Sequence, residues 1–192
     1  MKILGDAIAF GKKVVIADIH LGLLRFYDKQ LIEKAVKLAE RYQTVIVAGD
    51  LRHLGKRGLV EEFIERVGGI CELILIKGNH DAKLDFQRSI RFGKYGIFHG
   101  HAKPTEDLLD AKFWIVGHSH PSIYINGLKE RCFILGEIED KKVIVLPAFN
   151  DLCASTAINV EEPVGFIFKK YNYKDWKAIL LDGTIFSLSQ FF

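Results

Sequence analysis

Five short apolar segments in the first two thirds of the chain each end at a polar motif. They cover residues 14–17, 44–48, 73–76, 96–98 and 113–116. Continuous apolar runs of this length are typical of strands that are buried on both faces. Residues 29–42 and 59–67 separate the first three runs with apolar side chains at helical spacing, and residues 106–112 form a shorter helical stretch. The alternation predicts a mostly parallel α/β sheet, with the motifs gathered at the carboxyl ends of its strands.

The last third of the chain has the character of β-structure. Strands are predicted at residues 123–125, 131–137, 142–146 and 164–168, followed by a hairpin of residues 177–181 and 184–188. Asp182-Gly183, between the two hairpin strands, is a strong two-residue turn signal. A second sheet packed on the first accounts for both parts of the chain. Because 192 residues suit one domain rather than two, we expect a single domain that spans residues 1–192.

The composition indicates a protein without a membrane segment or a disulfide framework. The longest apolar runs, such as residues 143–149, are far shorter than a membrane span, and Asp6 precedes any signal-peptide core. Cys71, Cys132 and Cys153 form no CxxC pair, so each is expected to be a small core residue in a reducing compartment. A cytoplasmic location is the resulting prediction. The formal charge of +3 permits anionic substrates but falls short of a dedicated nucleic-acid binder.

Six of the seven histidines lie just after the predicted strands, together with acidic and amide side chains. Asp18 and His20 are separated by one residue, so both side chains can chelate one cation where the chain leaves a strand. Asp50 follows a glycine after the next apolar run, where a carboxylate can bridge two divalent cations. Asn79 adds a neutral oxygen donor beside His80. Each motif alone is explained at least as well by a loop cap or a turn.

The order of the motifs along the chain is more informative than any single motif. The motifs are Asp18-Ile19-His20, Gly49-Asp50, Gly78-Asn79-His80-Asp81, His99 and Gly117-His118-Ser119-His120. Together they resemble the calcineurin-like metallophosphoesterase superfamily, whose pattern of DxH, GD, GNH[DE], H and GHxH they match without a missing element. The resemblance spans residues 14–147, and its weight comes from the conjunction of short motifs that each follow an apolar run. It is strongest to a small single-domain branch that includes DNA-ligase-associated metallophosphoesterases and archaeal relatives. The implied fold is α/β, a two-sheet β-sandwich core flanked by helices.

The resemblance also implies a dinuclear metal centre, in which a metal-bridging hydroxide attacks the phosphorus atom. It assigns the first cation to Asp18, His20, Asp50 and His120. It assigns the second cation to Asp50, Asn79, His99 and His118. His80 is left as the general acid or electrostatic stabiliser of the leaving oxygen, with Asp81 fixing its orientation. Mn²⁺ is the ion expected in vitro, and Fe, Ni or Zn fit the same mixed nitrogen and oxygen donors.

The substrate and the roles of several residues stay open from the sequence alone. The expected reaction is hydrolysis of a phosphodiester, with a nucleotide or a nucleic-acid end among the substrates, and a phosphomonoesterase or nuclease of the same fold is the alternative. A non-catalytic protein-binding scaffold is a second alternative, which the presence of His80 disfavours. His99 is chosen over His101 as ligand because the family ligand directly ends its strand. Arg52 and His53 are candidates either for substrate contact or for an exposed loop. No protein partner follows from the sequence.

Overall fold

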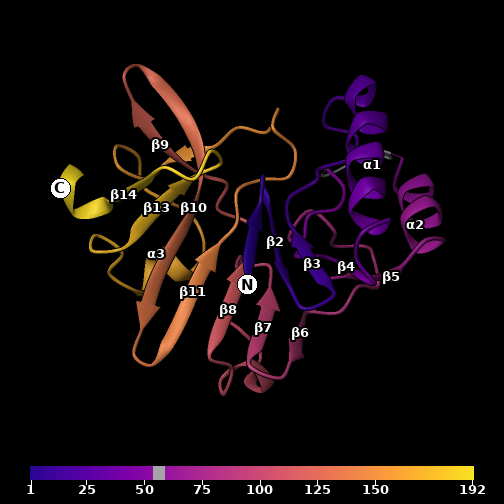
Figure 1. The fold of residues 1–192 in the computed structure, drawn as a ribbon, viewed down its shortest axis with the longest axis horizontal. Helices are drawn as coiled ribbons and strands as arrows, with labels where there is room; N and C mark the ends of the chain where they lie inside the picture. Colours follow the sequence, from indigo (N-terminus) through magenta and orange to yellow (C-terminus); the bar gives the residue numbers. More distant parts are fainter. Residues whose placement is uncertain (54–58) are drawn as a thin grey trace.

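The computed structural model describes residues 1–53 and 59–192, and its strands form two sheets (Figure 1). The first sheet has the order β1-β2-β3-β4-β5, formed by Lys2–Leu4, Ala7–Phe10, Lys13–Ile16, Thr44–Val47 and Glu72–Leu75. Strands β1, β2 and β3 are antiparallel neighbours, whereas β3, β4 and β5 run parallel. Parallel pairing brings the carboxyl ends of β3, β4 and β5 to one edge, where the motifs of Asp18, Asp50 and Asn79 begin.

The second sheet contains the remaining strands in the order β12-β9-β10-β11-β8-β7-β6. They are Thr156–Ala157, Pro121–Ile125, Leu128–Ile138, Lys141–Val145, Phe113–Val116, Tyr95–Phe98 and Ser89–Phe92. Strand β13 (Lys177–Leu180) pairs with β10 and with β14 (Ile185–Ser187). Strands β7, β8 and β11 are parallel, so their carboxyl ends also meet at one edge. The motifs of His99 and His118 follow β7 and β8 at this edge.

Three apolar clusters define the layers of the fold. One lies between the sheets and includes Val15 and Ile46 from the first sheet and Ile115 and Ile144 from the second. Helices α1 (Arg25–Ala39) and α2 (Val60–Gly68) share a second cluster with the opposite face of the first sheet. Helix α3 (Phe166–Lys170) contributes to a third cluster with the second sheet. This arrangement confirms the predicted fold class, a two-sheet β-sandwich flanked by helices.

The structure corrects three details of the sequence prediction. The five predicted strands do not share one mostly parallel sheet, because β3, β4 and β5 lie in the first sheet and β7 and β8 in the second. The predicted strand at residues 164–168 is wrong: α3 begins after Gly165, whose φ of 100° redirects the chain. The predicted helix at residues 106–112 is reduced to a short 3₁₀ turn, Glu106–Leu108.

The predicted hairpin at the carboxyl end is present. Strands β13 and β14 are antiparallel, and Gly183 in the connecting turn has a φ of 94°, which a glycine adopts without steric cost. A 3₁₀ helix, Leu188–Phe191, replaces the end of the second predicted strand. Throughout the described ranges, none of the helices has the length and apolar character needed to cross a bilayer.

Candidate metal centre

The predicted donors gather where the carboxyl-end edges of the two sheets meet. Backbone hydrogen bonds join their loops: Asp18 N donates to Gly49 O at 3.1 Å, and His20 N donates to Asp50 O at 2.9 Å. Glycines in the motifs permit this close approach. A Cβ at Gly49 would lie 2.2 Å from His99 Nδ1, and one at Gly78 would lie 2.0 Å from Asp50 Oδ1. Side chains from motifs far apart in sequence can therefore converge on one pocket.

The backbone of several donors has positive φ angles, and these help to direct the donor side chains towards one pocket. Five of them have positive φ angles, namely Asp18 (58°), His20 (50°), Asp50 (50°), His118 (73°) and His120 (40°). For residues other than glycine this left-handed conformation costs roughly 1–2 kcal/mol each. Residues held in such conformations concentrate at functional sites, where the surrounding structure enforces them. Here the enforced turns direct one carboxylate or imidazole after another into the same space.

The first group of donors surrounds Asp18. Asp18 Oδ1 lies 3.3 Å from His120 Nε2, and His120 Nε2 lies 3.3 Å from His20 Nε2. Asp50 Oδ2 is 3.8 Å from His20 Nε2. Asp18 is fully buried, and within the described residues its Oδ1 atom accepts no conventional hydrogen bond. A buried carboxylate oxygen in this state, facing imidazole nitrogens, fits a cation that would complete its interactions.

The second group of donors surrounds His99. His99 Nε2 lies 3.3 Å from Asp50 Oδ2 and 3.2 Å from Asn79 Oδ1. The nitrogens of His99 and His118 and an oxygen of Asp50 all lie within 4.8 Å of one another. Asp50 also forms a group of this kind with Asp18 and His20. The structure therefore places the Asp50 carboxylate between both sets of predicted ligands.

Two of the imidazoles are oriented by backbone carbonyl groups. His99 Nδ1 lies 2.9 Å from Ala48 O, and His120 Nδ1 lies 3.0 Å from Ala154 O. A carbonyl oxygen can only accept a hydrogen bond, so the Nδ1 atoms carry the proton in these contacts. Each Nε2 atom then faces the carboxylates. This outer support is typical of histidines that bind metal ions through the other nitrogen.

The charges in the site favour metal-binding forms of most donors. Burial by itself would raise the pKa of Asp50, but the hydrogen bond and charge of His99 hold that pKa well below the usual range. Burial lowers the pKa of His20 to about 4, and burial with the charge of His99 lowers that of His118 to about 4. The Asp18 carboxylate outweighs burial at His120 and raises its pKa to about 9. Ionised carboxylates and neutral imidazoles are the forms that ligate divalent cations.

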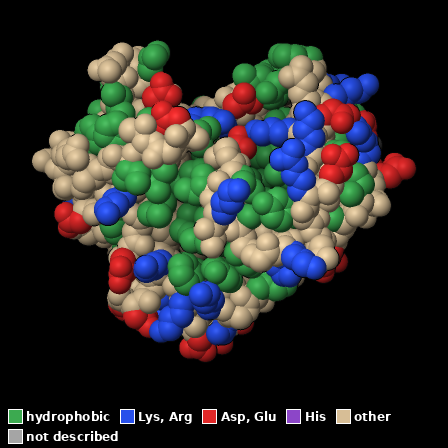
Figure 2. Space-filling view, viewed as in Figure 1, with side chains coloured by type: hydrophobic (Ala, Val, Ile, Leu, Met, Phe, Trp, Pro, Cys, Tyr) green, Lys and Arg blue, Asp and Glu red, His purple; other side chains and the backbone are tan. Residues whose placement is uncertain are grey.

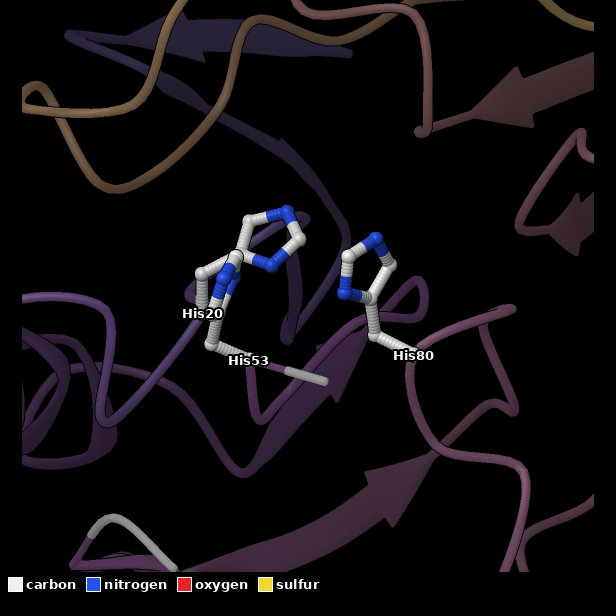
Figure 3. Close-up of side chains that lie close together, drawn as sticks. All are labelled: His20, His53 and His80. Atoms are coloured by element: carbon white, nitrogen blue, oxygen red, sulfur yellow. The ribbon is translucent and has the colours of Figure 1, made fainter. Parts of the chain in front are cut away.

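His80 lies at the same pocket but in a different setting. Its backbone N donates to Asp50 Oδ1 at 2.8 Å, and its Nε2 atom is 4.0 Å from Asp50 Oδ2. About a quarter of its side chain is exposed. Figure 3 shows the rings of His20, His53 and His80, which come from three segments and point towards one another. The ring centroids of His80 and His20 are 4.9 Å apart, and those of His80 and His53 are 5.3 Å apart.

Asp81 is fully buried and connects two of the donor loops. It accepts hydrogen bonds from the backbone N–H groups of Gly78 at 3.0 Å, Arg52 at 3.2 Å and Leu51 at 3.3 Å. Arg52 Nε in turn donates to His80 O at 3.3 Å. These contacts fix the backbone on both sides of His80. The predicted influence of Asp81 on the His80 ring stays a prediction.

His101 and His99 differ in burial. His99 is buried and touches Asp50 and Asn79, whereas His101 is exposed with its ring centroid 5.2 Å from that of His99. The geometry thus favours His99 as the donor that faces the carboxylates. His101 does not belong to either group of donors.

The loop after β11 brings Cys153, which was predicted from the sequence to be a core residue, to the donor pocket. Phe149 N donates to Ala17 O at 2.7 Å, and Asn150 Nδ2 donates to Ile19 O at 3.0 Å, so this loop braces the segment around Asp18. Cys153 follows, and its Sγ atom lies within 4.8 Å of donor nitrogens of His20 and His120. Burial raises the pKa of the Cys153 thiol to about 12. The parallel pairing of β11 with β8 brings this loop to the same edge of the sheet as the loop of His118.

Comparisons with known proteins identify the family of this chain. Residues 12–143 match the model of the calcineurin-like phosphoesterase superfamily domain. Comparison with curated protein sequences gives no match. Among solved structures, the nuclease MPE of Pseudomonas putida has a TM-score of 0.64 at 21% identity, covering 93% of this chain and 90% of that chain.

Two further solved structures have lower scores. A point variant of Vps29 from Entamoeba histolytica has a TM-score of 0.49 at 19% identity, covering 91% of this chain and 95% of that chain. A predicted phosphoesterase from Streptococcus pneumoniae has a TM-score of 0.43 at 15% identity, covering 91% of this chain and 96% of that chain. The family model covers more than half of the sequence and includes all the predicted donors. The chain therefore belongs to the calcineurin-like phosphoesterase superfamily and is a metal-dependent phosphoesterase.

Proposed function

We propose that this protein is a dinuclear metal-dependent phosphodiesterase. One observation carries the dinuclear part: Asp50 Oδ2 lies 3.8 Å from His20 Nε2 on one side and 3.3 Å from His99 Nε2 on the other. A single carboxylate between two sets of imidazoles is the arrangement that a pair of divalent cations needs for a shared ligand. Asp18, His20, Asp50 and His120 would hold the first cation. Asp50, Asn79, His99 and His118 would hold the second.

The cations, when bound, would supply charge neutralisation for the phosphate oxygens and a water of lowered pKa for in-line attack. The protein's own residues supply the rest. His80 lines the donor pocket and is partly exposed, and we assign its ring the role of general acid or electrostatic stabiliser of the leaving oxygen. Its backbone is fixed by the contacts with Asp50 and Arg52, and Asp81 holds the backbone of Gly78 and Arg52, so Asp81 acts as a positioning residue. A fixed acid near the leaving oxygen raises the rate because its reorganisation is already complete.

The choice of a diester rests on two supports. The motifs resemble those of a branch whose members act on phosphodiesters and nucleic-acid ends, and the Pseudomonas putida neighbour of the same fold is a nuclease. The donor pocket, about 300 Å³, is lined by His20, His53, His80, His118 and Cys153 among others, and none of its described lining residues is a lysine or arginine. A phosphate with two esterified oxygens carries one charge fewer than a monoester, and it requires less positive charge from the protein. Mn²⁺ is the first ion to test, with Fe, Ni and Zn as alternatives.

The decisive experiment compares two chromogenic substrates. Hydrolysis of bis-p-nitrophenyl phosphate and of p-nitrophenyl phosphate is measured with added Mn²⁺ for the natural protein and for His80→Gln, with the metal content of both determined by mass spectrometry. We expect diester turnover in the natural protein, a loss of about 100-fold or more in the variant, and equal metal content. Faster hydrolysis of the monoester would mean that the protein is a phosphomonoesterase and not a phosphodiesterase. Silence on both substrates with metal bound would favour the non-catalytic scaffold.

A further inference from the structure

A second cavity opens beside the donor pocket. It has a volume of about 330 Å³, at the lower end of the range for small-molecule sites. Asn79 lines both cavities, and His99 lines the second one as well. Asn79, a predicted ligand of the second cation, therefore lies between the two spaces. A substrate whose scissile phosphate lay at the donors could extend past Asn79 into this cavity.

Three basic side chains from separate segments line this second cavity. Lys77 follows β5, Arg88 precedes β6 and Lys103 lies in the loop after β7. None of the residues that the structure places on its wall is acidic. The three charges belong to no local run in the sequence. Only the crossover from the first sheet to the second brings them to one place.

These charges also have no acidic salt-bridge partner in the part of the chain that the structure describes. Within residues 1–53 and 59–192, no salt bridge involves Lys77, Arg88 or Lys103. Elsewhere basic residues do have acidic partners: Arg91 lies 3.9 Å from Asp110, for example. On the face shown in Figure 2, Lys and Arg side chains lie interspersed with Asp and Glu. Three cations without an acidic partner around a concave space are ready to receive an anion.

We propose that this cavity is a subsite for a second phosphate group of the substrate. The inference rests on the proposed function and narrows it to diesters that carry a further phosphate next to the scissile one. Arg88 is suited to hold two phosphate oxygens at once through its planar guanidinium, and Lys77 and Lys103 add charge without fixed geometry. The subsite sets substrate preference and leaves the chemistry at the donors unchanged.

The test uses two substrates that differ by one phosphate. They are the p-nitrophenyl ester of thymidylate and the same ester with a second phosphate on the other sugar hydroxyl. With Mn²⁺ added, the natural protein should show a higher kcat/KM on the doubly phosphorylated ester. Arg88→Gln and Lys103→Gln should each lower that value by about 10- to 100-fold, the effect of losing one hydrogen bond to a charged group. Turnover of the singly phosphorylated ester should change less than about twofold.

Matched controls remove the same charges at the other end of the sheet. Lys12 and Arg41 are exposed and precede β3 and β4, whereas the donors follow these strands. Lys12→Gln and Arg41→Gln should leave both substrates unaffected. If kcat/KM on the doubly phosphorylated ester fell equally in the control variants and the cavity variants, the effect would come from the net charge of the protein. That result would overturn the subsite.

A binding measurement separates the subsite from the reaction. Calorimetry compares thymidine bisphosphate with thymidine monophosphate on the metal-loaded protein and on Arg88→Gln. If the bisphosphate binds more tightly than the monophosphate and this difference disappears in the variant, the subsite is supported, whether or not the esters are hydrolysed. If neither ester is hydrolysed, the proposed function is refuted. Hydrolysis without any preference for the second phosphate, in rate or in binding, would overturn the subsite and leave the function standing.

Discussion

The two sheets contribute different chemistry to the donor pocket. Loops of the first sheet supply every oxygen donor, namely Asp18, Asp50 and Asn79, together with one imidazole from His20. The predicted ligands from loops of the second sheet are all imidazoles, namely His99, His118 and His120. Oxygen donors without their nitrogen partners, or the reverse, would make a weaker site for a transition metal. The difference teaches that the site exists only where the sheets are correctly packed, and that metal binding and sandwich packing should depend on each other.

The largest effect is expected at the residue that the first sheet places between both donor groups. Asp50→Asn keeps the size of the side chain but removes the charge shared by His20 and His99. We expect loss of both cations and a fall in kcat/KM of more than about 100-fold, since removing even an outer partner of a metal ligand costs about 10- to 100-fold. Metal stoichiometry by mass spectrometry is the measurement. Retention of one full equivalent of metal would show that Asp50 is not shared.

The imidazoles of the second sheet allow a sharper division. His99 contacts Asp50 and Asn79, whereas His120 contacts Asp18 and His20. His99→Gln and His120→Gln should each lower the metal content from two ions to one, and each should lose a different ion. Cobalt spectra of the two variants should therefore differ. Identical spectra would mean that the second sheet serves a single site.

Metal removal tests the dependence of sheet packing on the cations. If the ions bind only the folded state, a metal concentration of about 100 times the Kd stabilises it by about 2.7 kcal/mol. At about 2–4 °C per kcal/mol for a chain of this size, a chelator should lower the Tm by roughly 5–10 °C. Circular dichroism melts with Mn²⁺ or EDTA measure this. The Asp50→Asn protein serves as control and should melt at one temperature under both conditions.

The smallest effect is the pH dependence of the metal-free protein. His20 and His118 have folded-state pKa values of about 4, below the ordinary 6.5, so they stabilise the fold only while neutral. Their contribution is complete above pH 6.5 and is lost as the pH falls towards 4. His120, with a pKa of about 9, has the opposite sign: its contribution is complete below 6.5 and is lost as the pH rises towards 9.

Thermal melts of the metal-free protein should therefore show a decreasing Tm on both sides of a maximum near pH 6.5. His120→Gln should reduce the decrease on the alkaline side, where His99 also has a raised pKa, and should keep the acidic decrease caused by His20 and His118. An unchanged alkaline decrease in that variant would contradict the raised pKa of His120 beside the Asp18 carboxylate.

Much of the site could be predicted from the sequence because each donor follows a short apolar run. Parallel strands end at a common edge, so the order of motifs was enough to expect that Asp18, Asp50 and Asn79 would converge. The division into two sheets could not be predicted in the same way. An apolar run such as residues 113–116 looks the same whichever sheet receives it, and the pairing of β7 with β8 and β11 is a long-range property.

Other features depended on tertiary context that a local pattern does not contain. Residues 164–168 are apolar enough for a strand, but Gly165 adopts a positive φ and the chain closes a helical turn over the second sheet. Strands β1 and β2 were not predicted, although they extend the first sheet. Lys77, Arg88 and Lys103 are scattered along the sequence, so the basic cavity became visible only in three dimensions. Cys153 reached the donors for the same reason.

The positive φ angles at five donors have a consequence for how this protein can change over generations. While the cations are used, selection on activity retains Asp18, His20, Asp50, His118 and His120 in spite of their backbone cost. In a descendant that no longer bound metal, glycine or asparagine at these positions would relieve the strain and increase stability. Drift towards those residues would then be rapid. The identity of the residue at these five positions should therefore record whether a lineage still uses its metal centre.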